Sequence, residues 1–189
     1  MPAPCARSKR RRPGPADPAK PDPDSVVGMV EVRGPSVFDG YWGRPPDPSD
    51  RTAPTHPGEA AWFRTGDLGR WDDDGYLFLV GRSKDLIISG GLNVYPAEVE
   101  AVLERHPSVV EVAVIGLPDD EWGQVVAAIV VPSAAHRPLD ALGDELVEAA
   151  RSELSAYKIP RRLHWTDALP RNAMGKVDKV SLRDAFGRP

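Results

Sequence analysis

The sequence predicts an α+β fold, in which a small domain of strands and helices follows a set of β-hairpins. Three observations support this prediction. Clusters of valine and aromatic residues, separated by turn residues, dominate the region from 26 to 80. Apolar residues recur at helical spacing only from about residue 96 onward. The run at 125–131 is almost wholly apolar, which is typical of a central strand that is buried on both faces.

Composition and charge narrow the classes of function. Hydrophobic residues make up 41% and charged residues 28% of the 189-residue chain, a balance typical of globular domains. The net charge of −4 gives no general attraction to nucleic acid or to anionic lipid. No apolar run approaches the roughly 18 residues that a membrane-spanning helix needs. We therefore expect no nucleic-acid partner and no membrane span.

Residues 1–25 are predicted to form a disordered arm, because they are polar and rich in proline. A nucleic-acid or nuclear-targeting patch is the alternative interpretation of the basic run at 7–12. No aromatic residue is interleaved with these charges, which argues against base stacking. The single cysteine, Cys5, excludes an internal disulfide and favours a reducing compartment, so we expect a cytoplasmic protein.

The region from 26 to 81 is predicted to consist of β-hairpins. Residues 65–67 (Thr-Gly-Asp) and 72–75 (Asp-Asp-Asp-Gly) indicate turns between strands. The predicted strands lie at 30–32, 37–38, 62–64, 69–71 and 76–80. A few hairpins bury little core by themselves, so we interpret this region as the remnant of a larger domain.

The region from 86 to 189 is predicted to be a small domain with a three-stranded sheet and helices. Pro96 stands at a first-turn position, where proline favours the start of a helix. The predicted strands lie at 109–115, 125–131 and 161–165, and the predicted helices at 96–106, 139–156 and around 182–186. The short charged segment 82–85 joins this domain to the hairpins, either as an ordinary linker or as a hinge.

Candidate functional residues stand at three turns. Asp67 can accept hydrogen bonds from two neighbouring hydroxyl groups, or it can simply stabilise a turn. Gly90 and Gly91 allow a ligand to approach the backbone closely, although adjacent glycines also make ordinary turns. Lys176 follows Gly175 between a predicted strand and a predicted helix. A lysine there is solvated, or it meets a phosphate or carboxylate when the loop swings in.

Four blocks of sequence resemble the C-terminal part of the acyl-CoA synthetases of the adenylate-forming (AMP-binding) superfamily. They are residues 28–45 (GMVEVRGPSVFDGYWGRP), 62–67 (WFRTGD), 81–100 (GRSKDLIISGGLNVYPAEVE) and 170–179 (PRNAMGKVDK). The blocks at 84–96 and 170–176 are most similar to malonyl-CoA synthetases, and fatty-acid CoA ligases share much of this pattern. The resemblance implies an enzyme that uses ATP to convert a carboxylic acid to an acyl-adenylate and pyrophosphate. It then passes the acyl group to coenzyme A and releases AMP.

The resemblance also implies a role for each candidate residue. Asp67 would hold the ribose hydroxyls of the adenylate, and Arg82 would approach the ribose and the phosphate. Lys84 falls at the family's hinge position. Lys176 would bridge the attacking carboxylate and the α-phosphate. Gly90 and Gly91 would line the tunnel for the pantetheine arm of coenzyme A after the small domain rotates about the hinge.

Two blocks of the family pattern are not in this sequence. They are the Ser/Thr/Gly-rich phosphate loop and the Tyr-Gly-x-Thr-Glu block for adenine and magnesium. We therefore expect no metal site in this chain, a magnesium site in a separate N-terminal domain, and no adenylation by this chain alone. The alternatives are a non-catalytic remnant, an interaction module, or the end of a peptide-synthetase adenylation domain. The last is disfavoured because the sequence has no Gly-Gly-x-Ser site for phosphopantetheine.

Overall fold

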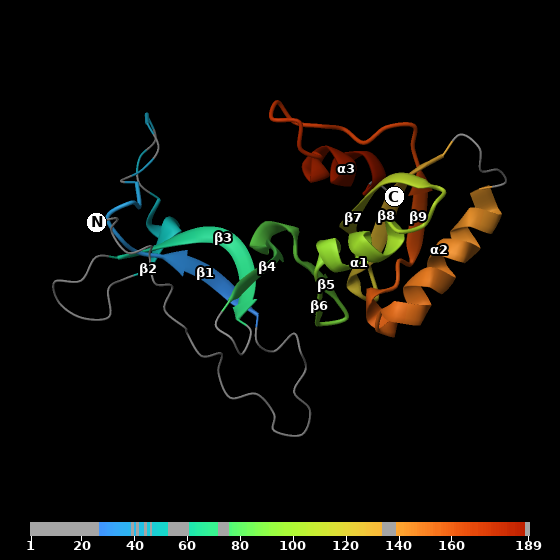
Figure 1. Cartoon of the computed structure of the whole chain (residues 1–189), viewed down its shortest axis with the longest axis horizontal. Coiled ribbons are helices and arrows are strands. Elements are labelled where there is room, and N and C mark those ends of the chain that lie inside the picture. Colours follow the sequence, from blue (N-terminus) through green and yellow to red (C-terminus); the bar gives the residue numbers. More distant parts are fainter. Residues whose placement is uncertain are drawn as a thin grey trace, which may run out of the picture. The chain divides into compact units, whose positions relative to one another are not determined.

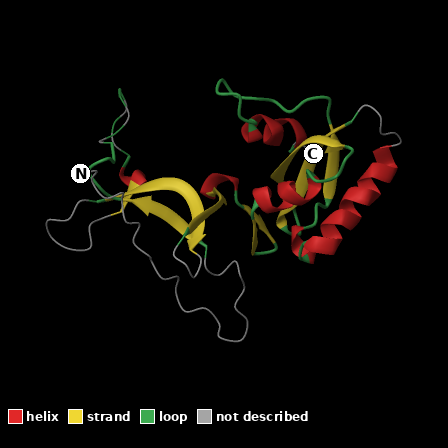
Figure 2. Cartoon of the chain, in the orientation of Figure 1, coloured by secondary structure: helices red, strands yellow, loops and turns green. Residues whose placement is uncertain are grey.

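A computed structural model of the chain describes residues 27–38, 40, 42–43, 45, 47–52, 61–71, 76–133 and 139–187. The chain divides into two compact units, Met1–Lys84 and Asp85–Pro189. Strands and helices are both present, and the predicted α+β class is confirmed (Figure 2). The predicted arm at 1–25 and the predicted turn at 72–75 lie outside the described residues.

The first unit contains a four-stranded antiparallel sheet around one long central strand (Figure 1). The central strand β3 (Trp62–Trp71) pairs along one edge with β1 (Gly28–Val32). Along its other edge it pairs with β2 (Arg51–Thr52) and β4 (Leu77–Arg82). A short 3-10 helix, η2 (Pro48–Asp50), precedes β2. Figure 1 shows β3 as the long curved ribbon of this sheet.

Two sequence-based predictions for this unit were wrong. The strand predicted at 37–38 is absent, because the Val37 N–H donates to the carbonyl of Gly34 at 3.1 Å and closes a turn. The two strands and the turn predicted within 62–71 are one continuous strand, β3. Residues 65–67 form a bulge in it, since the register against β1 shifts there. Gly66 has a φ of 77°, which a bulge accommodates as readily as a turn does.

The second unit contains a five-stranded sheet built on a long antiparallel hairpin, β7 (Val109–Asp119) and β8 (Gly123–Pro132). The other edge of β8 pairs in parallel with β9 (Arg162–Trp165). At Gly123, the same edge pairs antiparallel with β5 (Ile87–Ser89). The strand β6 (Leu92–Val94) pairs with β5. The sheet therefore has five strands where the sequence predicted three. The two additional strands have three residues each, which is too short to show an alternating pattern.

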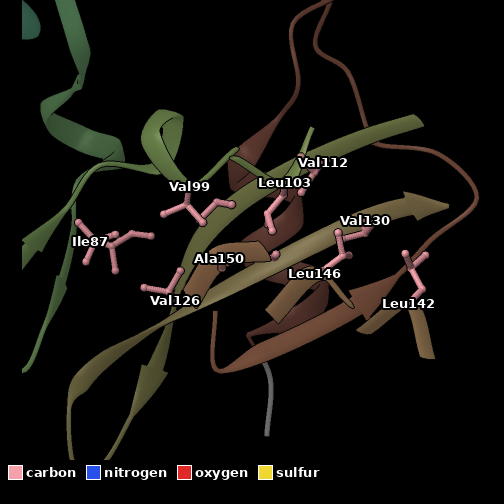
Figure 3. Close-up of a cluster of buried hydrophobic side chains, with 12 residues drawn as sticks. Ile87, Val99, Leu103, Val112, Val126, Val130, Leu142, Leu146 and Ala150 are labelled. Carbon is pink, nitrogen blue, oxygen red and sulfur yellow. The ribbon is translucent and has the colours of Figure 1, made fainter. Parts of the chain in front are cut away.

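The helices of the second unit cover both faces of its sheet. They are α1 (Pro96–Leu103), α2 (Leu139–Glu153) and α3 (Lys179–Phe186), with short 3-10 helices η3 (Ser83–Asp85) and η4 (Ala156–Lys158) at chain connections. Side chains of α1 and α2 form one buried cluster with the even-numbered residues of β7 and β8 (Figure 3). Leu182 of α3 belongs to a second cluster with the odd-numbered residues. Because successive strand residues point to opposite faces, burial on both faces accounts for the continuous apolar run of β8.

Charged side chains hold α1 in place among the apolar ones. The Glu98 carboxylate accepts two hydrogen bonds from the Lys158 ammonium, at 2.9 and 3.0 Å, and Lys158 is only 6% exposed. The Glu100 carboxylate accepts from the Lys179 ammonium at 2.7 Å and from the backbone N–H of Val114 at 2.8 Å. These contacts tie α1 to η4, α3 and β7. No helix in the described part of the chain is long and apolar enough to cross a membrane.

His164 makes the stability of the second unit depend on pH. Its Nε2 is buried and has no hydrogen-bond partner among the described residues, and its ring lies 4.9 Å from that of Phe186. Burial lowers the pKa of His164, and the nearby Arg162 charge lowers it further. The unfolded chain therefore binds a proton more readily than the folded chain does. This contribution to stability is complete above about pH 6.5 and is lost as the pH falls through the lower pKa of the folded state.

We predict that the free energy of unfolding falls less on acidification in His164→Gln than in the unsubstituted chain. The measurement is urea unfolding of the chain at pH 7.5 and pH 5.0, monitored by tryptophan fluorescence. The free energy of unfolding should fall more between these pH values in the unsubstituted chain than in the variant, which lacks the titrating ring. An identical fall in the two proteins would contradict the role given to His164.

Candidate functional site

Asp67 and Arg82 face each other across strands β3 and β4. Their Cα atoms are register partners, and the Arg82 Nε lies 2.7 Å from the Asp67 Oδ1. The side chain of Asp67 is 24% exposed and that of Arg82 is 53% exposed. A carboxylate has about four lone-pair sites, so this contact leaves Asp67 able to accept further hydrogen bonds from a ligand.

The bulge in β3 fixes the backbone of Asp67. The Thr65 hydroxyl donates to the Val30 carbonyl of β1 at 3.0 Å and accepts from the Asp67 N–H at 3.1 Å. Asp67 was predicted at a turn between two strands, and this placement was wrong because the strand continues through it. The chemistry at this position is unaffected by the correction, since the carboxylate remains partly exposed beside an arginine.

Gly90 and Gly91 form the two-residue turn between β5 and β6. Ser89 and Leu92 pair on either side of the turn, and the two glycines have φ angles of 57° and 81°. A two-residue hairpin turn of this kind requires positive φ at both central positions, which glycine adopts without strain. Both glycines are exposed, and no atom lies within 4 Å of the position that a Cβ of Gly91 would occupy. The backbone at Gly91 is thus open to close approach.

Lys176 lies at the end of a tight turn and is fully accessible to a ligand. The Asn172 N–H donates to the Lys176 carbonyl at 2.8 Å, and the Asn172 side-chain oxygen accepts from the N–H groups of Met174 (2.9 Å) and Lys176 (3.1 Å). Gly175 has a φ of 77° within this turn. The lysine side chain is exposed, whereas its backbone is well fixed.

Arg171 attaches this turn to the sheet. It forms an isolated bridge with Val177, and its guanidinium donates to the Gly175 carbonyl at 2.8 Å. The same guanidinium pairs with the Glu111 carboxylate of β7. Neither Arg171 nor Asn172 was predicted from the sequence as a supporting residue. The asparagine two residues before Met174 was the available signal, because asparagine side chains commonly accept hydrogen bonds from the backbone that follows them.

Lys84 lies in η3, at the boundary between the two compact units, and its side chain is exposed. The next residue, Asp85, belongs to the second unit and pairs with Arg183 of α3 at 3.1 Å. The candidate residues therefore divide between the units. Asp67 and Arg82 come together in the first unit, while the Gly90 and Gly91 turn and the Lys176 turn are separate features of the second. Among the described residues, no group of three or more His, Cys, Asp or Glu side chains could hold a metal ion.

The chain is similar to known proteins over most of its length. Residues 98–176 match the AMP-binding enzyme C-terminal domain. The chain is 45% identical over 168 residues to feruloyl-CoA synthase of an Amycolatopsis species, which covers 89% of the chain and 32% of that enzyme. It is 43% identical over 159 residues to the long-chain-fatty-acid–CoA ligase FadD13 of Mycobacterium tuberculosis, covering 84% of the chain and 30% of the ligase.

A solved structure gives a further match. The o-succinylbenzoate CoA synthetase MenE from Bacillus subtilis, in complex with its acyl-adenylate intermediate OSB-AMP, is 39% identical with a TM-score of 0.73. The match covers 97% of the chain and 35% of MenE. The chain thus spans about a third of the length of the relatives that it matches. Residues 98–176 thus match the AMP-binding enzyme C-terminal domain, and most of the chain is similar to about a third of each of these CoA-forming enzymes.

Proposed function

We propose that this chain is the C-terminal part of an ATP-dependent acyl-CoA synthetase. The observation that carries the proposal is the length of the match to CoA-forming relatives. The 168 residues matched to feruloyl-CoA synthase exceed the whole second unit, Asp85–Pro189, so the similarity extends into the hairpins of the first unit. The proposal therefore includes Asp67 and Arg82 as well as the C-terminal domain.

In the first half-reaction, a carboxylate oxygen attacks the α-phosphorus of ATP. A bond forms between the carboxylate and the phosphorus, and pyrophosphate leaves. The two reactants are both anions, so their approach is opposed by charge. The exposed ammonium of Lys176 is suited to lie between them, because its side chain is free to reach out while the Asn172 turn fixes its backbone. The role of Asp67 is to accept hydrogen bonds from the ribose hydroxyls, with Arg82 beside the ribose and the phosphate.

In the second half-reaction, the sulfur of coenzyme A attacks the acyl carbon as a thiolate. The bond between that carbon and the phosphate oxygen breaks, and AMP leaves. The thiol must approach through a narrow space, and Gly90 and Gly91 have no side chains to obstruct it. Rotation about Lys84 would exchange the Lys176 turn for the glycine turn between the half-reactions. The unit boundary at Lys84 and the ion pair that fixes Asp85 to α3 support this placement of the hinge.

The residues that the structure describes do not identify the carboxylic acid that the enzyme would use. Relatives named for feruloyl, long-chain fatty acyl and o-succinylbenzoyl groups match the chain at 39–45% identity. The resemblance to fatty-acid CoA ligases is confirmed by the match to FadD13. Because relatives named for such different acids are similar to this chain, the acid itself stays a prediction. The magnesium site likewise remains a prediction, for a separate ATP-binding domain. We place the enzyme in the cytoplasm, where ATP and coenzyme A are available.

A chimera with MenE tests the proposal. The part of MenE that precedes the position matching Gly28 is joined to residues 28–189. We expect pyrophosphate release that requires both ATP and o-succinylbenzoate, followed by o-succinylbenzoyl-CoA formation when coenzyme A is added. The preceding part of MenE alone is the control. A folded chimera that releases no more pyrophosphate than this control would instead favour a non-catalytic remnant or interaction module.

Within this chimera, we predict that Lys176→Ala lowers the rate of adenylation by about 100-fold or more, because one charge that stabilises the transition state is lost. Formation of the thioester from preformed OSB-AMP should change little. The two rates are measured separately, by pyrophosphate release and by appearance of the CoA thioester. Met174→Ala, in the same turn and 77% exposed, is the matched control. Equal loss of both half-reactions in Lys176→Ala would refute the role given to this lysine.

Lys84→Pro should have the opposite effect in the chimera. Proline restricts φ to about −65° and so reduces the range of backbone angles available to the hinge. We expect adenylation to continue while thioester formation from preformed OSB-AMP slows by about tenfold or more, the order expected when a gating motion limits the rate. Lys84→Ala, which leaves the backbone free, should retain both activities. Unchanged thioester formation in Lys84→Pro would place the swivel elsewhere in the chain.

A further inference from the structure

The glycine turn rests against the tip of the hairpin formed by β7 and β8. Three successive contacts join the two turns in antiparallel order. The Ile88 N–H donates to the Gln124 side-chain oxygen at 3.0 Å, Ser89 pairs with Gly123, and the Gly90 N–H donates to the Trp122 carbonyl at 2.9 Å. The strands β5 and β6 have only three residues each, so their hairpin has little stability of its own. Ile87 and Val94 anchor the base of this hairpin in the apolar core, and the three contacts fix its turn.

The indole ring of Trp122 fills the space beside Gly90. A Cβ atom at Gly90 would lie 2.7 Å from the Trp122 Cε3 and 2.9 Å from its Cζ3, closer than any normal contact. At Gly91 the corresponding position is open to 4 Å. The two glycines are thus required for different reasons. Gly90 allows Trp122 to press against the turn, and Gly91 leaves the other position of the turn free of side-chain atoms.

Two further side chains fix Trp122 from within the same unit. The Asp119 Oδ1 accepts from the N–H groups of Glu121 and Trp122, at 3.1 Å each, and the Asp119 Oδ2 pairs with Arg162 at 3.2 Å. The guanidinium carbon of Arg161 lies 4.1 Å from the centre of the indole ring, within the range of a cation–π interaction. The Arg161 N–H in turn donates to the Val126 carbonyl of β8 at 2.9 Å. Trp122 is therefore connected to β8, at the centre of the sheet, and to β9, which pairs with β8.

We infer that Trp122 is a positioning residue for the thioester-forming half-reaction, acting through Gly90 on the turn that receives the pantetheine arm. This inference rests on the proposed function of that turn. Trp122 carries no chemistry in the reaction. It determines where the backbone of Gly90 and Gly91 lies, and a displacement of about 1 Å from the productive geometry can cost as much as 100-fold in rate. The adenylation half-reaction does not use the turn and so does not depend on Trp122.

The kinetic test uses the MenE chimera with Trp122→Ala and Trp122→Phe. With preformed OSB-AMP, we expect kcat/KM for coenzyme A to fall by about tenfold or more in Trp122→Ala, chiefly through a higher KM, and to recover substantially in Trp122→Phe. Pyrophosphate release in the first half-reaction should stay within about twofold of the unsubstituted chimera in both variants. Glu121→Ala, an exposed residue of the same hairpin tip, is the control and should leave both half-reactions unchanged. Equal loss of both half-reactions in Trp122→Ala, or no loss in either, would overturn the inference.

Hydrogen–deuterium exchange on the full 189-residue chain tests the same contact without relying on enzyme activity. In Trp122→Ala, amides of residues 87–94 should exchange about tenfold faster, while those of α2 should be unaffected. Gly90→Ala should also accelerate exchange at 87–94, and the acceleration should be smaller in the Trp122→Ala background, where the clash is relieved and only the strain of the positive φ remains. Unchanged exchange at 87–94 in Trp122→Ala would overturn the inference even if the chimera is active. An inactive unsubstituted chimera would count against the proposed function alone, and the exchange rates would then decide whether Trp122 positions the turn.

Discussion

The burial of β8 on both faces is the constraint on which the second unit depends. Its side chains alternate between two apolar clusters, one shared with α1 and α2 and the other with α3. Each fully buried valine, leucine or isoleucine contributes roughly 1.5–3 kcal/mol, so no single polar contact in the unit compares with the sum of these burials. The candidate functional turns all lie outside this core. They are connected to its strands by short, specific contacts, which fix their backbones relative to the sheet.

The elements that were predicted correctly are those that leave a clear local pattern in the sequence. The apolar run at 125–131 indicated a central strand, and Pro96 marked the start of α1, because burial on both faces and a fixed φ leave clear patterns. The hairpin of β5 and β6 was missed because each strand has three residues. The bulge at 65–67 was interpreted as a turn because glycine at positive φ serves both, and only the pairing of β1 with β3 distinguishes them.

The candidate residues could be proposed from the sequence, but the contacts that support them could not. Asp67, Arg82, Gly90, Gly91 and Lys176 stand within recognisable blocks of sequence. Trp122, Asn172 and Arg171 act through neighbours that depend on tertiary structure, and a tryptophan in a turn or an arginine beside a proline has many ordinary explanations. Asn172 was closest to being predictable, because its partners Met174 and Lys176 lie within four residues of it. Trp122 was the least predictable, since its contact with Gly90 spans 32 positions of the chain, a separation that local patterns do not report.

The two candidate turns of the second unit combine a fixed backbone with an accessible functional group, and this combination suits a domain that takes part in two reactions. At 172–176, side-chain and backbone hydrogen bonds hold the turn and leave the lysine ammonium free to move. At Gly90 and Gly91, the indole of Trp122 and the edge of β8 hold the turn and leave the backbone itself accessible. If either turn were mobile, rotation of the domain would deliver its group with less accuracy, because the uncertainty of the turn would add to that of the rotation. Under the proposed function, the fixed backbone of both turns would allow one hinge to serve two half-reactions.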